Sequence, residues 1–162
     1  MIKNTNLTIG AIVVFIFVFA LSTSVMSQEG QKGASQKAEA EMKSAFGTVP
    51  IMFEVFPENM RAGAWEWFKS TMDPNAAIPS KYTELISLAV ASQIPCDYCV
   101  YAHTTMAKML GATDAEIKHA VASAAETRHW STVLNGNNVS YDEFKTEWDG
   151  ILEYLKKQGE AK

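Results

Sequence analysis

Two cysteines and a histidine lie in one short stretch of this sequence, at a spacing that suits thiol chemistry. Cys96 and Cys99 are three positions apart, and His103 follows Cys99 by four. Residues three or four apart on a helix are neighbours, with β-carbons about 5–6 Å apart. A helix that begins at about Cys96 would therefore carry two thiols and an imidazole on one face. A disulfide could close across such a pair, because bridged α-carbons usually lie about 4.4–6.8 Å apart.

The same placement favours reactive thiolates over inert thiols. A helix N-terminus carries unpaired N–H groups and a partial positive charge, which stabilise a thiolate at Cys96. An imidazolium at His103 would stabilise a thiolate at Cys99. In a CxxC pair, each sulfur can also stabilise the other as a thiolate. We therefore predict nucleophilic, redox-active cysteines.

A carboxylic acid on the preceding segment completes the candidate site. Glu84 lies in an apolar stretch that begins at Ser80 and is interrupted at Pro95, and it shares a helix face with Leu88 and Ala91. A carboxylate on such a face is costly unless it has a polar role. Glu84 is therefore a candidate proton acceptor.

Simpler interpretations of these residues stay open. Cys96, Cys99 and His103 could bind zinc with Glu84 as the fourth ligand, although three ligands on one short helix are uncommon in closed structural sites. The two cysteines could form a purely structural disulfide, but so short a loop gains little stability from closure. Glu84 could also be a surface residue at a helix start.

The surrounding sequence predicts helices and no strands. Apolar residues recur with the 3.6-residue helical period, and no segment alternates convincingly with period two. The clearest stripe consists of Phe144, Trp148, Ile151, Leu152 and Leu155. We predict an all-α fold, a compact bundle of six to seven helices.

Capping residues indicate where some of these helices begin and end. Ser35 is expected to cap a first helix that ends before Gly47. Thr113-x-x-Glu116 and Ser140-x-x-Glu143 match capping boxes at the starts of two later helices. The helix that begins at Ser80 is apolar almost all round, which predicts a position at the centre of the bundle.

The N-terminus has the layout of a secretory signal peptide. Lys3 precedes an uncharged apolar run of thirteen residues, 9–21, and cleavage is expected after Ser27. An uncleaved membrane anchor is the alternative, although a span needs about 20 residues. We expect a signal peptide over 1–27, a flexible leader over 28–34 and one helical domain over 35–162, in a protein exported to the periplasm.

Composition excludes some classes of partner and scaffold. Without Lys3, the only charged residue of the expected signal peptide, 13 basic and 18 acidic side chains remain, a net charge of −5. No basic stripe is interleaved with aromatics, so we expect no nucleic-acid partner. Two cysteines are too few for a disulfide scaffold. Aromatic side chains at Phe53, Phe56, Trp65 and Trp67 could line an apolar pocket, but core packing is the default expectation.

The pattern Glu-x11-Cys-x2-Cys-x3-His, formed by Glu84, Cys96, Cys99 and His103, resembles the AhpD-like (carboxymuconolactone decarboxylase) superfamily. The resemblance is strongest over residues 79–136. It implies an all-helical subunit that assembles into trimers or larger rings, with no cofactor. In its peroxide-reducing members, the second cysteine attacks the hydroperoxide, the first resolves it as a disulfide, and the Glu and His form a proton relay. Carried over, Cys99 is peroxidatic, Cys96 resolves, and Glu84 and His103 move protons.

This chain departs from those members in two ways. They carry a histidine just before the second cysteine, where this chain has Tyr98, so the relay could be shorter here. The best-known members also work in the cytoplasm with dedicated intracellular reductants, whereas this chain carries an export signal.

The sequence therefore leads to a first hypothesis and two rivals. The first is a thiol-dependent peroxidase or disulfide oxidoreductase, with a hydroperoxide or disulfide substrate and an external thiol reductant. The second is a decarboxylase-type lyase that uses Glu84 and His103 as acid and base. The third is a non-enzymatic redox-sensing module that changes its oligomeric packing.

Overall fold

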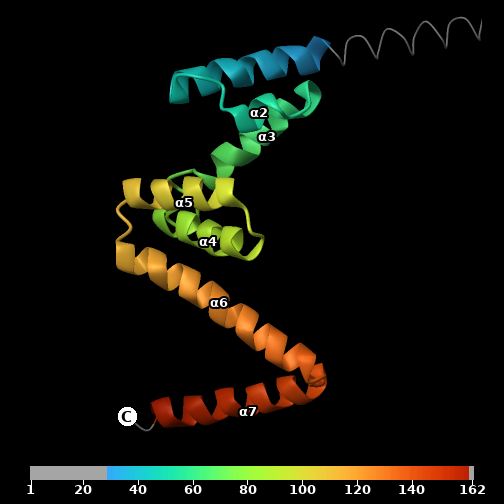
Figure 1. The fold of residues 1–162 in the computed structure, drawn as a ribbon, viewed down its shortest axis with the longest axis vertical. Coiled ribbons are helices and arrows are strands. Elements are labelled where there is room, and N and C mark those ends of the chain that lie inside the picture. The colour runs from blue at the N-terminus through green and yellow to red at the C-terminus, as the bar shows by residue number, and fades with distance from the viewer. Residues whose placement is uncertain (1–28, 161–162) are drawn as a thin grey trace, which may run out of the picture. The chain divides into compact units, whose positions relative to one another are not determined.

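The computed structural model describes residues 29–160, which form helices joined by short connections and contain no strand (Figure 1). The all-α prediction is therefore confirmed. After a first helix over 29–46, the helices are α2 (Ile51–Glu54), α3 (Glu58–Thr71), α4 (Ser80–Gln93), α5 (Asp97–Met109), α6 (Asp114–Gly136) and α7 (Tyr141–Glu160).

The predicted signal peptide over 1–27 lies outside the described residues. Within 29–160, none of the helices combines the length and the apolar composition that crossing a membrane requires. The described chain packs as two compact units that divide after Ala76, whereas the sequence predicts one helical domain over 35–162.

In the N-terminal unit, the helix over 29–46 packs with α2 and α3 around a small aromatic core. Met42 is fully buried, and Phe53 and Trp65 are each 4% exposed. The Trp65 and Phe68 rings stack, and Phe53 meets both of them edge-on, with centroids 5.7 Å apart in each pair. A polar contact reinforces this packing, because Trp65 Nε1 donates a hydrogen bond of 2.7 Å to Glu41 Oε2.

The bounds of the first helix agree with the sequence at one end only. It ends before Gly47, whose φ of +77° is the left-handed conformation that terminates helices. Its start differs, because residues 29–34 are helical and Ser35 lies inside the helix rather than at its cap. Two glycines, Gly30 and Gly33, lower helix propensity there. Burial of one helix face, with Ser35 and Met42 almost inaccessible, outweighs that preference.

In the C-terminal unit, α4 packs against both α5 and α6. One face of α4 is buried, with Leu88 and Ala91 each 1% exposed. The opposite face is not, since Ile86 is 51% and Val90 55% exposed. The predicted central position of α4 is therefore met on the face that packs against α5 and α6, while its outer face is exposed in the described chain.

The last two helices begin where the capping patterns predict. Thr113 caps α6 with both hydrogen bonds of a capping box to Glu116. The following helix, α7, begins directly after Ser140 and contains no buried residue.

Candidate redox site

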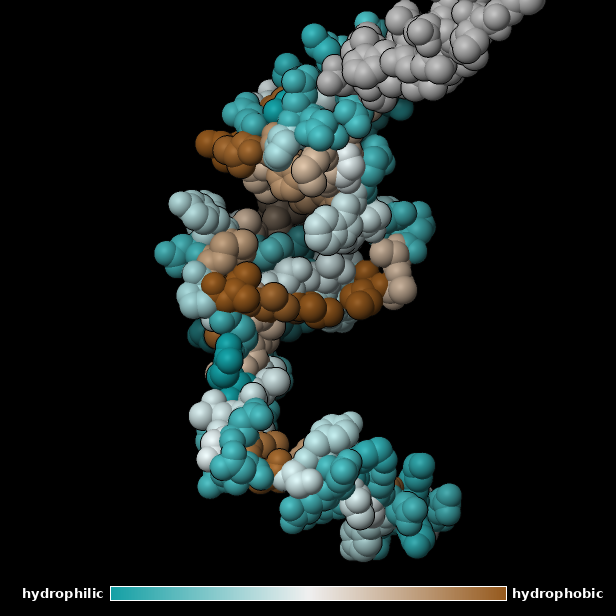
Figure 2. Space-filling model, turned by 90° about the vertical axis from the view of Figure 1, so that its right-hand side faces the viewer, coloured by the Kyte–Doolittle hydropathy of each residue, from teal (hydrophilic) through white to brown (hydrophobic). Residues whose placement is uncertain are grey.

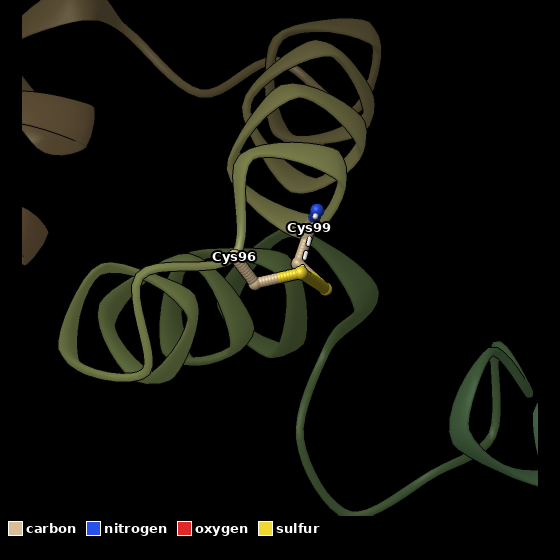
Figure 3. Close-up of a disulfide and its surroundings, with 2 residues drawn as sticks. All are labelled: Cys96 and Cys99. Carbon is tan, nitrogen blue, oxygen red and sulfur yellow. Dashed lines mark hydrogen bonds between the residues drawn. A yellow bond between two sulfur atoms is a disulfide. The ribbon is translucent and has the colours of Figure 1, made fainter.

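Cys96 occupies the N-cap of α5, as the sequence predicts for a helix that begins near it. Its backbone N–H donates to Ala91 O at 3.2 Å, which holds the start of α5 against the end of α4. Its Sγ accepts a hydrogen bond from the Cys99 backbone N–H at 3.3 Å (Figure 3). The CxxC pair therefore begins the first turn of the helix, among unpaired N–H groups that stabilise negative charge.

Cys96 and Cys99 form a disulfide across that first turn (Figure 3). Their α-carbons are 5.3 Å apart, within the range that a disulfide spans without backbone movement. Both cysteines are half-buried, so the pair is accessible from solvent without lying fully on the surface.

Glu84 and His103 make the second contact of the site. Nδ1 of His103 and Oε2 of Glu84 are 2.7 Å apart, which joins α4 to α5. The Glu84 side chain is 5% exposed and that of His103 is 32% exposed. The alternative in which Glu84 is a surface residue is therefore wrong.

This hydrogen bond determines which imidazole nitrogen can take up a proton. With Glu84 as a carboxylate, which only accepts hydrogen bonds, Nδ1 of His103 would be the donor of this contact. Nε2 of a neutral His103 is then free to accept a proton. The carboxylate can also stabilise the imidazolium that would result.

The structure places Glu84 on α4 and the other three predicted site residues on α5 and its N-cap, and these two helices pack against each other. Glu84 contacts His103 directly, and His103 lies one helical turn after Cys99 on α5. Their catalytic roles stay predictions. Among the residues that the structure describes, no group of three or more His, Cys, Asp and Glu side chains is arranged to hold a metal ion.

Tyr98, where peroxidase members of the superfamily carry a histidine, is 88% exposed. It lies between the two cysteines in sequence, yet the Glu84–His103 hydrogen bond forms without it. Phe53 and Trp65 are core residues, as expected by default, whereas Trp67 and Phe56 are 75% and 40% exposed.

Two contacts that hold α4 to α6 were missed by the sequence analysis. Lys81 Nζ lies 2.7 Å from Glu116 Oε1, and Arg128 Nε donates to Gln93 Oε1 at 2.9 Å. The Lys81 ammonium and the hydrogen bonds from Thr113 lower the pKa of Glu116 to about 2. No pattern within a short stretch of sequence indicates these pairs, because the two partners of each are 35 residues apart.

Comparison with known proteins indicates the family to which this sequence is similar. A sequence model of the carboxymuconolactone decarboxylase family matches residues 56–140. Over 84 residues, the chain is 32% identical to a protein of Mycobacterium tuberculosis named alkyl hydroperoxide reductase. That alignment covers 51% of this chain and 24% of the relative, so the chain spans about a quarter of that relative's length.

A solved structure described as the alkylhydroperoxidase AhpD core of Rhodospirillum rubrum superposes with a TM-score of 0.61. The match covers 74% of this chain and 90% of the other, at 19% identity. It shows that the two share an all-helical fold.

Proposed function

Since the chain belongs to the carboxymuconolactone decarboxylase family, we propose that it is a thiol-dependent peroxidase or disulfide oxidoreductase that reduces hydroperoxides through Cys96 and Cys99. The observation that carries this proposal is the position of the cysteine pair. It begins the helix whose next turn holds His103, hydrogen-bonded to the buried Glu84. The relative named alkyl hydroperoxide reductase supports the choice of hydroperoxide as substrate.

The proposed reaction starts from the reduced pair. His103 takes the Cys99 proton, and the thiolate attacks the terminal peroxide oxygen, which breaks the O–O bond and leaves a sulfenic acid on Cys99. The leaving alkoxide is protonated to the alcohol. Cys96 then attacks Sγ of Cys99, water departs, and the disulfide forms. An external dithiol restores both thiols by thiol–disulfide exchange.

Glu84 and His103 would supply proton transfer in this scheme. The charge of Glu84 stabilises the imidazolium formed when His103 accepts the Cys99 proton. The Glu84–His103 pair does not include the sulfurs. The same two groups could therefore act as acid and base in a decarboxylase-type lyase. Turnover that survives alkylation of both thiols would identify that alternative.

The test compares hydroperoxide consumption by the reduced wild type, Cys99→Ser and Cys96→Ser. The wild type is expected to consume one equivalent and stop in the absence of a reductant. Cys96→Ser should react once and retain a sulfenic acid on Cys99, while Cys99→Ser should stay at the background rate. Equal rates for the wild type and Cys99→Ser would refute the assignment.

We also propose that the protein is exported to the periplasm and works as a homo-oligomer, a trimer or larger. In an oxidising compartment, the disulfide would be the resting state until a reductant arrives. N-terminal sequencing of the mature protein tests the export proposal. A mature chain that begins at Gln28 is expected, and an uncleaved chain in the cytoplasm would contradict it.

A further inference from the structure

The last helix, α7, carries an apolar stripe that no other part of residues 29–160 covers. Trp148, Ile151, Leu152 and Leu155 lie on one face of α7 and are 41–57% exposed. Large apolar side chains along one helix face normally pack against another element. In this chain α7 buries none of its residues.

A matching apolar groove lies between α4 and α6. It has a volume of about 490 Å³, and its lining includes Ile86 and Val90 of α4, Ile94 at the C-cap of α4, and Ala124, Thr127 and Arg128 of α6. The three isoleucine and valine side chains follow one another at intervals of four residues and are 51%, 55% and 62% exposed. Figure 2 shows a row of exposed hydrophobic side chains at the level of α4 and α5.

We propose that α7 of one copy lies in the α4–α6 groove of a second copy, so that each subunit donates one helix and receives one. This inference does not depend on the thiol chemistry. The stripe from Phe144 to Leu155 extends for about 17 Å, and the apolar line from Ile86 to Ile94 for about 12 Å, at 1.5 Å per residue. The two surfaces are therefore of comparable length.

Charge distribution supports this pairing. Among the described residues that line the groove, Arg128 is the one with a charged side chain, and its hydrogen-bond partner is the neutral amide of Gln93. On α7, Glu147 is a helical neighbour of both Phe144 and Ile151, so it borders the stripe. A helix seated in the groove can therefore bring the Glu147 carboxylate to the Arg128 guanidinium.

The area that a stable interface buries favours an arrangement in which each copy both donates and receives a helix. A stable interface buries about 1,600 Å² in total, and one helix stripe in one groove is small against that. A subunit that donates its α7 and receives another makes two such contacts. Pairs or closed rings both satisfy this geometry.

A cross-linking experiment tests which chain occupies the groove. In the full-length protein with its native disulfide intact, Val90→Cys is combined with Ile151→Cys under mild oxidation. Covalent species of two or more chains are expected on a non-reducing gel. The matched control pairs Val90→Cys with Glu153→Cys, which lies on the opposite face of α7 and should not cross-link. A bond within one chain, or no bond, would overturn the proposal.

A charge exchange tests the register independently. Arg128→Glu should weaken self-association by about tenfold or more, measured by sedimentation, because two carboxylates would then face each other. Adding Glu147→Arg to the same chain should restore it. Self-association that Arg128→Glu leaves unchanged, a double variant that stays weak, or a wild type that is monomeric at micromolar concentration would each refute this contact.

Discussion

At the scale of single residues, the proposed chemistry depends on one buried carboxylate, Glu84, and the imidazole of His103 that it contacts. Glu84 is 4% exposed, and the short contact to His103 gives it a polar partner that can offset the cost of burying its charge. Because Nδ1 faces the carboxylate, Nε2 is the nitrogen available to a thiol proton. Glutamine in place of Glu84 keeps the size and a hydrogen bond, and removes only the charge.

We predict that Glu84→Gln slows the reaction of the reduced protein with hydroperoxide. Without the carboxylate, the imidazolium formed at His103 loses its stabilising charge, and a loss of about 10²-fold in the second-order rate constant is expected for one proton-transfer group. Stopped-flow measurement of thiol oxidation gives this constant directly.

Tyr98→Phe is the matched control, because Tyr98 is 88% exposed and forms no hydrogen bond with Glu84 or His103 in the described structure. Its rate should stay within about twofold of wild type. If Glu84→Gln reacts as fast as Tyr98→Phe, the Glu84–His103 pair has no part in proton transfer.

At this scale, the placement of the candidate residues could be predicted where they are close in sequence or share an apolar face. The burial of Glu84 followed from Leu88 and Ala91 beside it, and the Cys99–His103 relation followed from helical spacing. The contacts that Lys81 and Arg128 make between α4 and α6 could not be predicted in this way. Each depends on how α4 meets α6, which a local pattern does not encode.

At the scale of helices, two separable interactions stabilise the start of α6. Glu116 closes the capping box with Thr113 and also binds Lys81 of α4. Glutamine can still close a capping box, so Glu116→Gln removes the ion pair and keeps the cap.

We predict that Glu116→Gln removes an acid-dependent part of the free energy of unfolding. The pKa of Glu116 is lowered from 4.5 to about 2 in the folded chain, so its contribution is fully present above pH 4.5. It is lost as the pH falls from 4.5 toward 2, because the unfolded chain then binds the proton more tightly. Urea unfolding at a series of pH values should show wild type and variant converging toward pH 2; parallel profiles would contradict this account.

The first helix yields a prediction about a buried hydroxyl. Ser35 is 1% exposed, and its Oγ has no hydrogen-bond partner among the described residues. Ser35→Ala should leave stability unchanged or raise it by about 1 kcal/mol, since it removes an unsatisfied polar group and improves helix propensity.

Met42→Ala provides the contrast, because Met42 is fully buried on the same helix and a cavity there should cost about 2–5 kcal/mol. Urea midpoints measure both variants. A Ser35→Ala variant destabilised as much as Met42→Ala would mean that the Ser35 hydroxyl makes a stabilising contact.

Helix termini marked by a specific capping residue were predicted better than the start of the first helix. Gly47 and Thr113 carry specific terminal chemistry, namely a positive φ and a side-chain cap. Residues 29–34 contain two glycines, and their helix depends on burial further along the chain. The cap expected at Ser35 therefore placed the helix start too late.

At the scale of the whole molecule, the hydrophobic pattern showed which helix faces are apolar and left open what covers them. The stripe on α7 and the outer face of α4 were both recognisable in the sequence. A single bundle over 35–162 was the simplest way to cover them, whereas the described chain packs as two units and leaves both faces exposed. Contacts between copies of the chain, as proposed above, supply the missing partner.

The proposed function requires that the Cys96–Cys99 pair cycles with a hydroperoxide. The most direct measurement is intact-mass analysis of the fully reduced protein after one equivalent of an alkyl hydroperoxide, with the alcohol product quantified in the same sample. We expect the protein mass to fall by two hydrogens as the disulfide forms, and one equivalent of alcohol to appear. A protein that keeps both thiols while the hydroperoxide persists would contradict it.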